Sequence, residues 1–82
     1  MKTSEQIIET IKTKRLEHET IIKQMSKDIE IVRAKLAEMI QAKVAKDVLF
    51  PQTNALMVLK DKMMFHKAAI LVYDDLLKDI GA

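Results

Sequence analysis

Apolar residues recur every three or four positions along most of this 82-residue chain, which is the spacing of one face of a helix. If Ile8 is taken as position a of a seven-residue repeat, the a and d positions are all apolar from Ile22 to Met39. A second set with the same spacing runs from Leu56 to Ile80 and is interrupted only by His66. Both segments therefore predict helices that pack as coiled coils do.

Capping and helix-breaking residues set the expected bounds of the two helices. Thr3 can cap the first helix, with Gln6 as its reciprocal partner in a capping box. Pro51 disfavours the helical conformation of the residue before it, so the first helix should end upstream of it. The predicted fold is an all-α, two-helix antiparallel hairpin with a long first helix. Its parts, in a single domain over 1–82, are a helix over about 4–45, a loop over about 46–53 and a helix over about 54–80.

The second predicted helix is too short to cover the first. In such a hairpin Ile70 would lie near Val32 and Tyr73 near Ile29, so residues 4–20 would have no partner in their own chain. Burying their isoleucines would recover several kcal/mol, at about 0.8 kcal/mol per CH₂. We therefore expect a coiled-coil-like homo-oligomeric bundle, a dimer or a higher oligomer. The expected oligomer or partner interface comprises Ile8, Ile11, Ile22, Met25, Ile29, Val32, Phe65, Ile70, Tyr73 and Leu77.

Polar residues interrupt both apolar faces. Arg15 and His18 occupy an a and a d position, either as part of an exposed arm or as a polar layer that sets the register of an oligomer. His66 occupies a d position of the second helix, and in this hairpin it would lie far from His18. Each histidine is either satisfied or water-bridged at a seam, or it has a pH-sensitive or ligand-binding role. Acidic residues at the end of the second helix would approach lysines of the first, namely Asp74, Asp75 and Asp79 against Lys23 and Lys27.

Composition narrows the possible classes of protein. The chain has no cysteine, 49% apolar residues and a formal net charge of +2, which excludes a disulfide framework and disfavours both disorder and a strongly basic nucleic-acid binder. The basic cluster of Lys12, Lys14 and Arg15 is short and is interleaved with glutamates. No apolar run approaches the roughly 20 residues that a bilayer span needs. Glu5 and Glu9 interrupt the early apolar residues that an export signal would need, so we expect a cytoplasmic protein.

Residues with catalytic or metal-binding chemistry are few. Ser4 and Ser26 are the only serines and lack a nucleophile motif, and neither histidine has the spacing of a metal site. We therefore predict no catalytic, cofactor-binding or metal site, and a protein that is not an enzyme. Methionine suits adaptable protein contacts. A patch that meets another protein is expected at Met57, Met64 and Phe65, with Leu49 and Phe50 near the loop.

The opening residues Met1-Lys2-Thr3-Ser4-Glu5-Gln6-Ile7-Ile8-Glu9 and the length of the chain give it a family resemblance. The whole chain resembles the cytoplasmic antiholins of the third rapid-lysis locus of T-even bacteriophages, which are accessory proteins of lysis inhibition. The resemblance implies a non-enzymatic regulator in the host cytoplasm. Such a protein binds the cytoplasmic segment of the membrane holin and delays lysis. It implies no particular functional residue, because no motif carries it.

Two other functions remain open from the residues alone. One is a small phage nucleic-acid-binding or transcription-modulating protein, which would use the basic cluster and would bind with a steep dependence on salt. The other is a helical scaffold or chaperone that shields another protein's helix. The coiled-coil pattern by itself does not distinguish a scaffold from a regulator.

Overall fold

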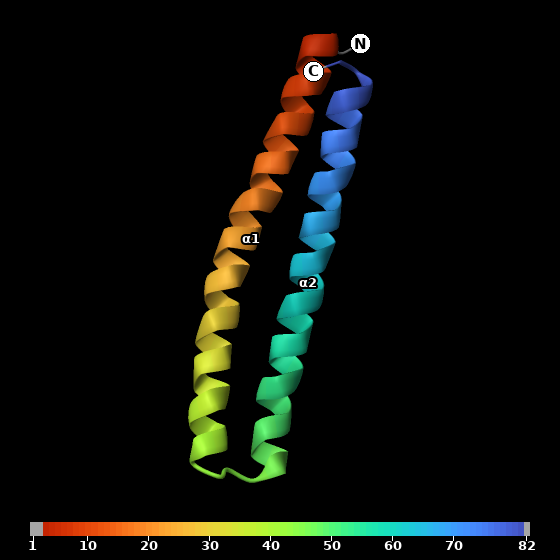
Figure 1. Cartoon of the computed structure of the whole chain (residues 1–82). Helices are drawn as coiled ribbons and strands as arrows, with labels where there is room; N and C mark the ends of the chain where they lie inside the picture. Colours follow the sequence, from red (N-terminus) through yellow and green to blue (C-terminus); the bar gives the residue numbers. More distant parts are fainter. Residues whose placement is uncertain (1–2, 82) are drawn as a thin grey trace.

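The chain folds into two long helices that pack side by side as an antiparallel hairpin (Figure 1). This computed structural model describes residues 3–81, with α1 over Ser4–Gln41 and α2 over Lys46–Asp79. The start of α1 and the end of α2 lie together at the end of the hairpin opposite the loop (Figure 1). The predicted all-α class and the predicted hairpin are confirmed.

The predicted capping box at the start of α1 is present. The backbone N–H of Gln6 donates to the Thr3 hydroxyl at 3.2 Å, and the Thr3 backbone N–H donates to the Gln6 side chain at 2.9 Å. Glu5 adds a negative charge in the first turn, where the helix dipole favours it. Two of the donors that a helix start leaves unpaired are therefore satisfied locally.

The loop lies earlier in the chain than the sequence predicted. α1 ends at Gln41 rather than near residue 45, and α2 begins at Lys46 rather than near 54. Lys43 adopts the left-handed conformation with φ of 55°, which stops α1 from continuing. Ala45 is extended and its carbonyl accepts from the N–H groups of Val48 and Leu49, which starts α2. The connection between the helices is therefore the short segment 42–45.

Pro51 lies inside α2 instead of preceding it. Its ring removes the backbone N–H that would otherwise donate to the carbonyl of Asp47 in the first turn. That cost is offset because Leu49 extends the apolar face of α2 towards the loop; its side chain and that of the polar Gln52 are both half-buried. Packing of this apolar face therefore outweighs the local preference for a break at Pro51.

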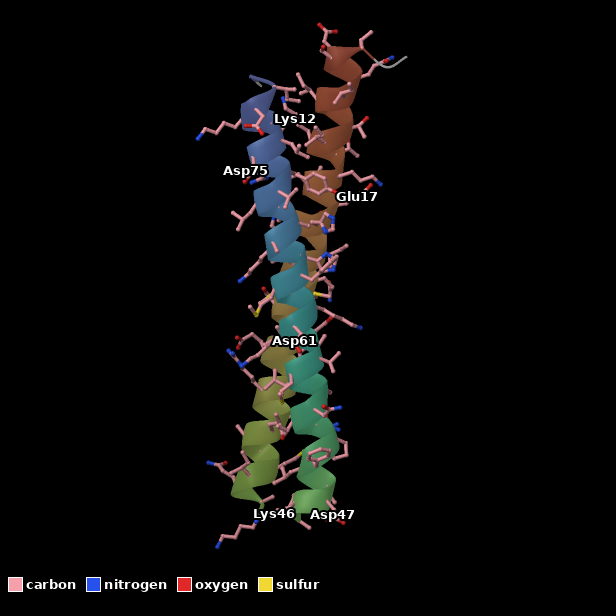
Figure 2. The ribbon with its side chains drawn as sticks, turned by 90° about the vertical axis from the view of Figure 1, so that its right-hand side faces the viewer. Lys12, Glu17, Lys46, Asp47, Asp61 and Asp75 are labelled. Carbon is pink, nitrogen blue, oxygen red and sulfur yellow. The ribbon has the colours of Figure 1, made fainter. Side chains whose placement is uncertain are left out.

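The earlier loop lets α2 run alongside nearly all of α1. Arg15 contacts Asp74, His18 contacts His66, and the Ser26 hydroxyl lies 3.6 Å from the sulfur of Met63. The expectation that residues 4–20 lack a partner in their own chain is therefore wrong. Figure 2 agrees with this register, because Lys12 of α1 and Asp75 of α2 lie near the same end of the hairpin, opposite the loop at which α2 begins with Lys46 and Asp47.

Side-chain burial follows the predicted heptads. Within residues 3–81 the most buried side chains are Ile29, which is 4% exposed, and Leu36, which is 9% exposed; both are a positions of α1. The other apolar a and d side chains of the two helices are half-buried, apart from Ile80. We call this line of contact between α1 and α2 the inner seam. The hairpin measures 59 × 19 × 15 Å and has no wider core.

Neither described helix has a stretch both long and apolar enough to cross a bilayer.

Candidate protein-interaction surface

A polar layer crosses the inner seam near the open end of the hairpin. The Nε of Arg15 donates to the carboxylate of Asp74 at 2.5 Å, and a second guanidinium nitrogen pairs with Glu19 one turn further along α1. The hydrogen bond to Asp74 is the largest effect that raises the pKa of Arg15 above its ordinary value. Asp74 therefore pairs with Arg15, and not with Lys23 or Lys27 as the predicted register required.

The two histidines meet one turn deeper in the seam. The Nδ1 atoms of His18 and His66 lie 2.7 Å apart, so one must carry the proton and the other must accept it. The ring of Tyr73 lies on the other side of His18, with 5.6 Å between the ring centroids. The expectation that the histidines lie far apart is wrong, because it rested on the later loop. Arg15, His18, His66 and Tyr73 form one polar layer within a single chain.

The structure uses most of the predicted interface residues inside the hairpin. Nine of them are buried or half-buried on the inner seam, namely Ile8, Ile11, Ile22, Met25, Ile29, Val32, Ile70, Tyr73 and Leu77. They hold the two helices together and do not form a separate surface for a partner. Phe65 is the exception, with 68% of its side chain exposed. Its ring stands edge-on to His66, at 5.5 Å between centroids.

A line of large exposed apolar side chains follows the outside of α2. Its members recur every seven residues, at the b positions of the heptad, and each is more than half exposed: Phe50, Met57, Met64 and Leu71. We call this line the methionine stripe. It includes Phe50, Met57 and Met64 of the predicted patch, whereas Leu49 faces the inner seam and Phe65 lies on a different line of α2. Flexible thioethers beside aromatic and branched side chains suit a surface that adapts to a partner's helix.

A shallow groove between the helices adjoins the stripe. Ile29 and Met63 contribute apolar side chains to it, and Met64 of the methionine stripe also lines it. Its polar lining residues are Ser26, Glu30, Arg33 and Lys60. Arg33 forms an ion pair with Glu30 at 3.7 Å, which leaves Lys60 as the cation of this groove without an ion-pair partner among the described residues. An apolar groove with charged residues beside it fits an amphipathic helix.

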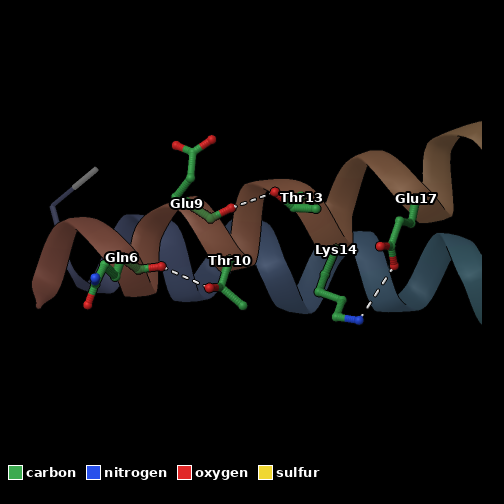
Figure 3. A pocket seen from close by; sticks show the side chains of 6 residues that line it. All are labelled: Gln6, Glu9, Thr10, Thr13, Lys14 and Glu17. Atoms are coloured by element: carbon green, nitrogen blue, oxygen red, sulfur yellow. Dashed lines mark hydrogen bonds and ion pairs between the residues drawn. The ribbon is translucent and has the colours of Figure 1, made fainter. Parts of the chain in front are cut away.

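A second hollow is lined only by residues of α1, and most of its polar groups already have partners within that helix (Figure 3). Its threonine hydroxyls are used within the helix, because Thr10 donates to the carbonyl of Gln6 at 2.8 Å and Thr13 to that of Glu9 at 2.9 Å. Lys14 pairs with Glu17 at 3.6 Å on the same surface (Figure 3). These groups have their partners already, so the hollow is an ordinary helix surface.

The basic cluster of the sequence does not present three free charges. Arg15 is held by Asp74 and Glu19, and Lys14 pairs with Glu17, which leaves Lys12 as its remaining cation. A nucleic-acid surface needs cations that are available to phosphates. This arrangement therefore does not favour the nucleic-acid alternative.

Among the described residues no group of three or more histidine, cysteine, aspartate or glutamate side chains is placed to hold a metal ion. Large exposed apolar side chains are more numerous on α2 than on α1. The chain matches no protein-family model, no curated protein sequence and no solved structure.

Proposed function

We propose that this chain is a non-enzymatic regulator that acts by binding an amphipathic helix of another protein. The observation that carries the proposal is the methionine stripe together with the groove that Met64 lines. These side chains lie along about six turns of one helix, at 3.6 residues per turn, on a surface that the hairpin itself leaves open. Helix-in-groove recognition uses anchors with this kind of spacing.

The resemblance to the cytoplasmic antiholins of T-even phages suggests which helix is bound. On that proposal the partner is the cytoplasmic segment of a membrane holin, the site of action is the host cytoplasm, and binding delays lysis. A matching segment would carry apolar residues that cover Met57 and Met64 and an acidic residue that reaches Lys60. Charge complementarity of this kind selects the partner and its orientation more than it adds affinity.

A peptide-binding measurement tests the proposal directly. A fluorescent peptide of the candidate holin's cytoplasmic segment is titrated with the protein, and binding is followed by anisotropy. The substitution Met64→Glu should weaken binding at least tenfold, because it removes an apolar contact and places a charge against the peptide. The matched control is Ile31→Glu on α1, because Ile31 is 66% exposed and Met64 is 67% exposed.

The same two variants should differ in their effect on the time of lysis. Overexpressed wild-type protein and Ile31→Glu should delay lysis, whereas Met64→Glu should not. If the peptide binds Met64→Glu as tightly as the wild type, the methionine stripe is not the binding surface. If the wild type binds no holin peptide, the antiholin proposal fails and a helical scaffold becomes the better description.

A further inference from the structure

α2 carries a second heptad line that the hairpin does not use. It consists of c and g positions, which alternate in steps of three and four residues as the residues of a packed seam do. Its apolar members are Ala55, Val58, Phe65, Ala69, Val72 and Leu76. We call this line the outer seam. Lys62 is the one polar residue between Ala55 and Leu76 on it.

The outer seam lies along one flank of the hairpin, and the two flanks differ in character. Flanking residues of α1 on the same side include Ile7 and Ile21, which are also exposed. The opposite flank carries the ion pairs of Arg15 and the charged residues Arg33 and Lys60 beside the groove. The outer seam and the groove beside the methionine stripe therefore lie on opposite flanks of the hairpin.

We propose that the outer seam binds a second copy of this chain, with α2 antiparallel to α2 of that copy about a two-fold axis. In one antiparallel register both apolar layers between residues 55 and 72 pair an alanine with a valine. Ala55 meets Val72 of the second copy, and Val58 meets its Ala69. Across the axis the aliphatic stem of Lys62 covers the Phe65 ring of the second copy, a contact in which the ammonium can remain in solvent.

Self-complementarity of this kind is what a two-fold interface requires, because each layer on one side of the axis is repeated on the other. The row of f positions separates the outer seam from the methionine stripe, and three of its four members are polar, namely Asn54, Asp61 and Asp75, with Ala68 as the fourth. Figure 2 shows Asp61 about midway along α2 and Asp75 towards its end. A dimer formed through the outer seam therefore leaves the methionine stripe open, and the two proposals stand or fall separately.

The exposed area of the hairpin agrees with a dimer. A compact protein of 9.4 kDa is expected to expose about 5,000 Å², whereas this hairpin exposes 6500 Å². A compact particle of twice that mass would expose about 8,300 Å², which is about 4,700 Å² less than two separate hairpins. Stable obligate dimers bury about 2,000–5,000 Å² in total, so the available surface is sufficient.

Sedimentation equilibrium tests the proposal with neighbouring substitutions. The wild type should sediment as a dimer of the 9.4 kDa chain. Val72→Glu should raise the dimer dissociation constant at least tenfold, because it places a carboxylate in an apolar layer. The control Leu71→Glu changes the adjacent side chain, which is 66% exposed against 57% for Val72 but lies on the methionine stripe. Leu71→Glu should remain dimeric, with circular dichroism showing that both variants are folded.

Disulfide trapping tests the register without disturbing the seam. The chain has no cysteine, so the double variant Val58→Cys with Ala69→Cys introduces the only thiols. The two positions are too far apart on one helix to bridge within a chain, so oxidation should give a covalent dimer. The control Met57→Cys with Ala68→Cys has the same spacing but is moved by one residue out of the seam, and it should stay monomeric under denaturing conditions.

Several outcomes would overturn the proposal. If the wild type is monomeric throughout the concentration range, the outer seam does not bind a second copy of the chain and would have to bind a different protein. Equal effects of Leu71→Glu and Val72→Glu, or equal trapping by the two cysteine pairs, would place the interface elsewhere. Holin-peptide binding by a monomer would preserve the proposed function while this inference fails, and a dimer without peptide binding would do the reverse.

Discussion

The inner seam makes a sharp prediction about two isoleucines that lie two residues apart on α1. Ile29 is 4% exposed and Ile31 is 66% exposed, although both are isoleucines of α1 with nearly the same neighbours in the sequence. Ile29→Ala should therefore destabilise the fold strongly, and Ile31→Ala should not. The comparison isolates burial from residue type.

The magnitude follows from the difference in packing. Truncating a buried isoleucine to alanine costs about 2–5 kcal/mol, and the cost is lowest where the surroundings can collapse into the space. A seam between two helices can close partly around the gap, so we expect about 2–3 kcal/mol for Ile29→Ala. Ile31→Ala loses little burial, and alanine is the better helix former, so it should be neutral or stabilising by less than about 0.7 kcal/mol.

Urea denaturation followed by far-ultraviolet circular dichroism measures both free energies of unfolding. All variants are compared at one protein concentration, because an assembling chain has a stability that depends on concentration. If the two substitutions cost the same, or if Ile31→Ala costs more, then α1 does not pack on α2 through its a and d positions. The assignment of the buried face of α1 would then be refuted.

Two further predictions follow from local features. Pro51→Ala should raise the free energy of unfolding by about 1–3 kcal/mol in urea denaturation, because it restores a helical N–H; if Pro51 instead ended a loop, the change would be near zero. Thr3→Ala should lower the melting temperature through a loss of about 1 kcal/mol, and an unaltered melting curve would mean that the capping box does not hold the start of α1 in solution.

The spacing of apolar residues predicts much of the hairpin. Ile29 and Leu36 were expected at a positions, and they are the most buried side chains described. The capping box at Thr3 was also readable, because its chemistry is confined to four consecutive residues. Periodicity reports which face of a helix is buried, and neighbouring residues report how a helix begins.

The register between the two helices could not be predicted from periodicity, because it depends on where the loop lies. Periodicity does not say which residue of the other helix lies opposite Arg15 or His18. Two features of the sequence conflict here, because Pro51 favours a loop whereas Leu49 continues the apolar a positions of α2 through the predicted loop. Moving the loop to 42–45 shifts every cross-helix pair, which is why the contact between His18 and His66 was missed while both residues were correctly placed on the seam.

The unequal character of the two helices argues for the place of each in an assembly. Large apolar side chains lie on three lines of α2, which are the inner seam, the methionine stripe and the outer seam, whereas α1 has one continuous apolar line. A hairpin can bury only one line of each helix. α2 is therefore the helix from which further contacts would be made, and α1 is the one that covers its inner seam. Changes on the two outer lines of α2 should then alter association and leave the helical content of the hairpin intact, whereas changes on the inner seam should unfold the hairpin and lose both kinds of contact together.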